Sequence, residues 1–107
     1  MPTEDRIRIE HMIDAGGSVA RFIADRHRVD IETDEMLRFA LVRAIEIFGE
    51  AASKISAETR SAYSNIPWQA IVGMRNRLAH AYFNIDGDIL WVAASNDSYQ
   101  SVASEHI

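Results

Sequence analysis

The sequence predicts an all-α fold, an antiparallel four-helix bundle, on the strength of three observations. Apolar residues recur at intervals of three and four, and few runs alternate with a period of two. The prolines are Pro2 and Pro67, so the interior is nearly free of helix breakers. The 107 residues, 48% of them hydrophobic, suffice for one core. We therefore expect a single domain over residues 1–107, with short connections that favour antiparallel neighbours.

The first predicted helix covers residues 4–27. Its apolar stripe consists of Ile9, Met12, Ile13, Val19 and Ile23. Gly16 and Gly17 lie inside this stripe, and each costs about 1 kcal/mol relative to alanine in a helix. A close helix–helix crossing or a kink would explain the pair.

The second predicted helix runs from about Thr33 to Ser53, with Thr33 as the N-cap. One side is apolar and is expected to face the core: Leu37, Ala40, Leu41, Ala44, Phe48, Ala51 and Ile55. The opposite side is mixed and carries Phe39, Arg43, Glu46 and Glu50. A mixed face of this kind is either a solvated surface or half of a partner interface.

Residues 61–66 read as a connector, and Pro67 is predicted to open a third helix at its first position. One side of that helix is lined by Trp68, Ile71, Val72, Arg75, Leu78 and Tyr82. Residues 84–87 form a break with Asp and Gly turn chemistry. A last amphipathic segment follows, and its expected core positions are Ile89, Val92, Ala93 and Tyr99.

Composition excludes several functional classes. The chain has no cysteine, so it has neither disulfides nor thiolate metal sites, and no apolar run approaches ~20 residues. We expect a soluble, cytoplasmic protein with no membrane partner. The net charge of −5 argues against a general phosphate-backbone binder, so no DNA partner is expected. Ten of the eleven cations are Arg, which suits bidentate contacts with phosphate but is equally a product of genome bias.

Metal and cofactor sites are not expected either. The four histidines, His11, His27, His80 and His106, are scattered and lack ligand spacing such as i and i+4.

The polar residues concentrate in the segment 74–83, which contains Arg75, Asn76, Arg77, His80 and Tyr82. Arg is a fixed cation whose planar fork fits phosphate, and His can exchange a proton near neutral pH. Together they are sufficient for phosphodiester cleavage without a metal. The alternative from composition alone is that both arginines are surface cations and His80 is a helix C-terminal histidine favoured by the macrodipole.

Spacing complicates a single-chain site. Arg75 and His80 are five apart, about 140° around an ideal helix, so they do not share a face. Asn76 and Arg77 each share a face with His80, while Arg75 and Tyr82 are nearly in line. A second copy of the helix across a homodimer would bring two Arg and two His into one cleft.

The order Arg75, four residues, His80, one residue, Tyr82 resembles the Arg-x4-His-x-Tyr signature of the HepT-like toxins of the HEPN (higher eukaryotes and prokaryotes nucleotide-binding) superfamily. Three segments extend the resemblance: 44–52 is similar to the family's second-helix segment, 66–83 to its motif helix and 86–91 to the lead-in to its last helix.

The resemblance implies an α-helical homodimer that cleaves RNA without metal, as the toxin of a type II toxin–antitoxin pair. It implies Arg75 and His80 as catalytic residues. Asn76 is polar and adjacent and is expected to support them, and Arg77 is expected to contact the substrate. It also implies a minimal nucleotidyltransferase antitoxin that silences the toxin by adding AMP to Tyr82, which would block the cleft with bulk and negative charge.

Two other functions stay open at this point. One is a non-catalytic HEPN subunit that binds a nucleotide or positions the nucleotidyltransferase, and the other is an orphan helical dimerisation module. The intact Arg75, His80 and Tyr82 favour the ribonuclease toxin.

Overall fold

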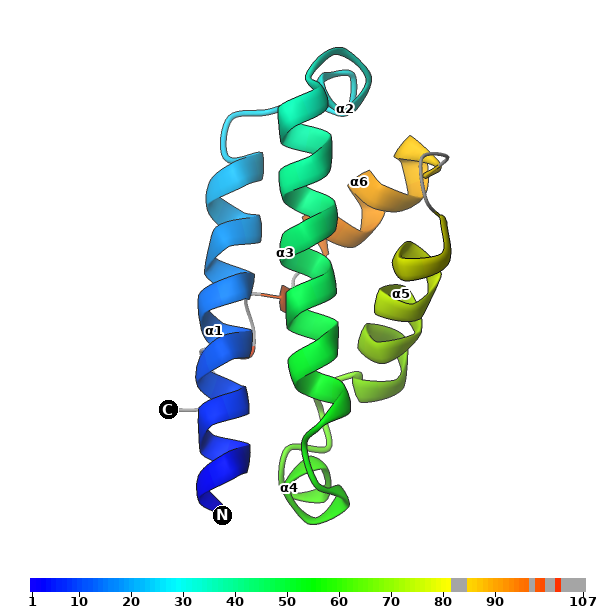
Figure 1. The fold of residues 1–107 in the computed structure, drawn as a ribbon. Helices are drawn as coiled ribbons and strands as arrows, with labels where there is room; N and C mark the ends of the chain where they lie inside the picture. The colour runs from blue at the N-terminus through cyan, green and yellow to red at the C-terminus, as the bar shows by residue number, and fades with distance from the viewer. Residues whose placement is uncertain (82–84, 97, 100–101, 103–107) are drawn as a thin grey trace.

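The computed structural model describes residues 1–81, 85–96, 98–99 and 102. These residues form helices and no strand, which confirms the all-α prediction. The helices are α1 (Thr3–Ile23), α2 (Asp30–Thr33), α3 (Glu35–Ser53), α4 (Ala57–Ala62), α5 (Trp68–Ala81) and α6 (Gly87–Ser95). Helix α3 lies in the middle, with α1 antiparallel to it on one side and α5 antiparallel to it on the other (Figure 1). None of the helices in this described part is long and apolar enough to cross a bilayer.

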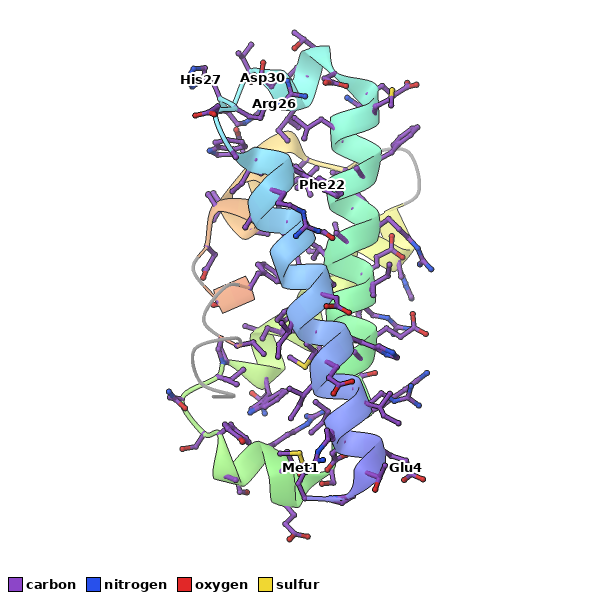
Figure 2. The ribbon with its side chains drawn as sticks, turned by 90° about the vertical axis from the view of Figure 1, so that its left-hand side faces the viewer. Met1, Glu4, Phe22, Arg26, His27 and Asp30 are labelled. Carbon is purple, nitrogen blue, oxygen red and sulfur yellow. The ribbon has the colours of Figure 1, made fainter. Side chains whose placement is uncertain are left out.

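The turn between α1 and α3 corrects two predicted boundaries. Helix α1 ends at Ile23 rather than near residue 27, and Asp25 then adopts a φ of 60°, which a helix does not allow. Figure 2 shows Arg26, His27 and Asp30 at this end of the molecule, where the His27 amide donates to the Asp30 carboxylate over 2.7 Å.

The predicted Thr33 N-cap is wrong by one residue. Thr33 ends the short helix α2, and Asp34 caps α3 by accepting from the Leu37 amide over 3.1 Å. The Arg26 guanidinium also binds the Asp34 carboxylate. The Leu37 amide and this ion pair lower the pKa of Asp34, so the cap depends on a tertiary partner as well as on local chemistry.

Helix α4 occupies residues that were partly predicted as connector. The Ser56 hydroxyl caps this helix by accepting from the Thr59 amide. The hydroxyls of Ser56 and Thr59 both donate to the buried carboxylate of Asp5 at the start of α1. The Ser56 amide donates to the same carboxylate over 3.2 Å. These hydrogen bonds lower the pKa of Asp5 and tie α1 to α4.

The core lies between α3 and the helices around it. The predicted apolar stripe of α3 is confirmed, except that Ala40 is only half-buried, and Phe48 packs edge-to-face on Tyr99 with ring centroids 4.7 Å apart. Glycine is required at position 16 because the backbone of Tyr99 lies close to it: a Cβ there would be 2.0 Å from the Tyr99 carbonyl oxygen. The core prediction for Val92 is wrong: its side chain is 65% exposed, and Leu90 and Ala94 of α6 point inward instead.

Candidate active site

Arg75 is positioned by the closest contact between α5 and α3. A Cβ added to Gly49 of α3 would lie 2.3 Å from the Cβ of Arg75 and 3.1 Å from the Ile71 carbonyl oxygen. Only glycine fits at this crossing, because real Cβ atoms do not approach so closely. The crossing therefore holds the stem of Arg75 half-buried against α3, on the side of α5 that also carries the buried Ile71 and Leu78.

The Arg75 guanidinium reaches along the helix to its neighbour. Its Nη1 donates to Asn76 Oδ1 over 2.9 Å. Within the described part of the chain, Arg75 has no ion pair with a carboxylate. Its charge is thus directed toward the exposed side of α5, and no acidic side chain of the described residues compensates it.

His80 lies exposed in the last turn of α5, one turn after the exposed Asn76. Helix α5 is continuous from Trp68 to Ala81, so the five-residue spacing keeps Arg75 and His80 about 140° apart. The hydrogen bond from the Arg75 guanidinium ends on Asn76, which shares a face of α5 with His80. The hydrogen bond thus joins the Arg75 guanidinium to an exposed edge of α5 that Asn76 and His80 share.

The other two predicted site residues have different outcomes. Arg77 is exposed and lines a groove between α5 and α6, so it lies toward a different neighbour from Arg75. Tyr82 lies outside the described residues.

The charge of the segment that contains α5 differs from that of the whole chain. Residues 59–85 contain three arginines and no Asp or Glu, and the nearest carboxylates in the sequence belong to Glu58 and Asp86. All sixteen acidic residues therefore lie outside the segment that carries the motif. A net charge of −5 is compatible with a locally cationic helix face.

Sequence reasoning missed the role of Gly49. Glycine lowers helix stability by about 1 kcal/mol, so one in the middle of a core helix signals a close approach. That signal was present in the sequence, but it did not identify Arg75 as the residue that contacts it. No cluster of three potential metal ligands occurs among the described residues.

The proteins that this chain resembles are named as ribonucleases. The family described as Ribonuclease HepT-like matches residues 12–103. A protein of Methanocaldococcus jannaschii named as a candidate RNase is 36% identical over 80% of this chain and 79% of its own length. The “Probable ribonuclease HepT” of Thermococcus cleftensis is 38% identical over 64% of this chain and 62% of its own length.

A second M. jannaschii protein, named as a gamma-glutamylcyclotransferase and candidate RNase, is 30% identical over 91% of this chain but only 44% of its own length. No solved structure matches the chain significantly. The family match covers most of the chain and includes the whole of α5, with Arg75, Asn76 and His80. The chain belongs to the Ribonuclease HepT-like family of the HEPN superfamily, and so to a family of ribonucleases.

Proposed function

We propose that this protein is an endoribonuclease that cleaves RNA with Arg75 and His80 and needs no metal ion. One observation carries the proposal: the Arg75 guanidinium is hydrogen-bonded to Asn76 on the edge that also bears His80, in a segment free of carboxylates. The ribonuclease names of the relatives support the same reaction class.

The chemistry needs a base, an acid and a cation at the phosphate. The His80 imidazole takes the proton of a ribose 2′-hydroxyl, whose oxygen then bonds to phosphorus. The bond from phosphorus to the 5′-oxygen breaks, and that oxygen takes a proton from His80 of a second copy. Arg75 stabilises the charge on the non-bridging oxygens, while the Asn76 amide donates to the same phosphate.

A homodimer supplies the second histidine. Contacts with α1 and α5 leave one exposed arc on α3, and this arc carries Phe39 (55% exposed) and Arg43. We propose that a second copy docks on this arc beside α5, so that two Arg75 and two His80 side chains face one cleft. Sedimentation equilibrium tests this, and a monomer that persists at tens of micromolar would contradict the composite cleft.

The proposed biological role is that of a toxin in a type II toxin–antitoxin pair. Its partner is a minimal nucleotidyltransferase that adds AMP to Tyr82, the tyrosine that follows His80 by two residues in the motif. Incubation with that enzyme and ATP should add AMP to wild-type protein and not to Tyr82→Phe. Peptide mapping that finds AMP on Tyr63 or Tyr99 instead would contradict the assignment.

The central experiment compares wild-type, His80→Ala and His27→Ala proteins on total RNA in the presence of EDTA. Wild-type and His27→Ala, a matched change at an exposed histidine outside the motif, should cleave. His80→Ala should lose ~10²–10⁴-fold in rate with little change in melting temperature. Arg75→Lys should also be severely impaired, because it keeps the charge but loses the planar fork.

Three outcomes would overturn parts of this mechanism. Cleavage that survives in folded His80→Ala removes His80 from it. Activity lost with EDTA and restored by Mg²⁺ or Mn²⁺ contradicts the metal-free reaction. Wild-type protein that never cleaves, although free of AMP, favours the non-catalytic HEPN subunit.

A further inference from the structure

A groove of about 390 Å³ runs between α5 and α6, outside the Arg75–Asn76–His80 edge. Its walls are mainly apolar and include Met74 of α5 with Ile89 and Val92 of α6. Val92 is 65% exposed and lines this groove, which is where the sequence-based core prediction failed. Ala70 of α5 also lines the groove, and its small, exposed side chain leaves the groove open on that side. Binding sites for small organic groups have this character and a volume of roughly 300–1,000 Å³.

The groove has one cation that is not engaged elsewhere. Arg77 lines it, is exposed, and makes no ion pair with any described residue. Asp88 also lines the groove, but its carboxylate accepts from Arg28 Nε over 2.7 Å. Arg28 binds Glu32 as well, so Asp88 and Glu32 belong to one ion-pair network. Arg77 is therefore the group that remains to meet an anion at the groove.

Arg77 also connects the groove with the proposed catalytic edge. Arg77 and His80 are three residues apart on α5, on one side of the helix and about 4.5 Å apart along its axis. A nucleic-acid strand whose phosphate lies at His80 can continue across this side of α5. Its next phosphate then meets Arg77, and the attached base meets the apolar walls beyond it.

We propose that the α5–α6 groove is a subsite for one nucleobase of single-stranded RNA, with Arg77 bound to the adjoining phosphate. The inference rests on the proposed ribonuclease function and extends it to substrate recognition. A nucleobase fits the walls because its faces are apolar, and the Met74 thioether makes favourable contacts with aromatic rings. Apolar walls hold the base without reading its hydrogen-bonding edge, so the subsite tolerates different bases.

The test measures RNA binding rather than cleavage, in the His80→Ala background. Fluorescence anisotropy compares a labelled twelve-nucleotide oligouridylate with an all-abasic strand of the same length. Ala70→Leu fills the groove and should weaken oligouridylate binding about 5- to 100-fold while leaving abasic binding unchanged. Ala62→Leu, a matched change at an exposed alanine on α4, should affect neither strand.

Arg77→Gln tests the phosphate contact separately. It should weaken both strands and reduce the slope of log affinity against log salt by about 0.7, the value for one lost phosphate contact on a single strand.

Several results would overturn the subsite: no effect of Ala70→Leu, an equal loss on both strands, a change in oligomeric state in place of a change in RNA affinity, or no RNA binding at all. The two proposals fail separately. Wild-type cleavage combined with an inert Ala70→Leu change removes the subsite alone. Base-dependent, groove-dependent binding by a wild-type protein that never cleaves RNA keeps the subsite and removes the ribonuclease.

Discussion

Replacing Gly49 with alanine tests whether the α3–α5 crossing sets the position of Arg75. The new methyl carbon would lie 2.3 Å from the Arg75 Cβ, whereas ordinary contacts begin at 3.4 Å, so the helices must separate by more than 1 Å. Overpacking of this kind costs about 1–3 kcal/mol. The higher helix propensity of alanine returns about 1 kcal/mol, which leaves a net loss of about 0–2 kcal/mol in the free energy of unfolding.

Activity should fall much further than stability. A displacement of about 1 Å in a catalytic group can cost about 10²-fold in rate, so Gly49→Ala should lose RNA cleavage while it still folds. Circular dichroism should show a melting temperature lower by about 4–8 °C for each kcal/mol lost.

The matched control is Gly17→Ala in α1, where the nearest atom to the new carbon is the flexible Arg21 Nη1 at 3.3 Å. It should keep full cleavage. Gly49→Ala protein with wild-type cleavage and melting temperature would refute the reasoning, because the crossing would then tolerate a Cβ.

Three further expectations concern stability. Gly16→Ala should lower the melting temperature, because its Cβ would lie 2.0 Å from the Tyr99 carbonyl oxygen. Gly17→Ala has more room and should raise the free energy of unfolding by up to about 1 kcal/mol. Equal effects of the two changes in thermal melts would contradict this. Asp5→Ala should destabilise the fold at pH 7 and less so in acid. The pKa of Asp5 is lowered in the folded state, so its carboxylate stabilises the fold above about pH 4, and this stabilisation is lost as the pH falls through the folded-state pKa. Urea titrations at several pH values check this. Burial raises the pKa of Tyr99 to about 12, so stability should fall between about pH 10 and pH 12, and Tyr99→Phe should lack that alkaline loss in the same titrations.

The candidate active-site residues show which features of the site can be predicted from local sequence patterns. Arg75, Asn76 and His80 were found from their spacing and from a family resemblance, and helical geometry alone gave the 140° angle between Arg75 and His80. The hydrogen bond from Arg75 to Asn76 was not predictable, since several rotamers of each side chain are compatible with the same spacing.

The sequence by itself determined the helical class, the core stripe of α3 that includes Leu41 and Phe48, and the start of α5 next to Pro67. Each of these follows from residues within a few positions of one another, because helix periodicity and proline stereochemistry act locally. Only the tertiary structure decided that Arg75 lies against Gly49 and that Val92 lines a groove instead of the core. These contacts join residues distant in sequence, and they depend on how helices pack, which no local period encodes.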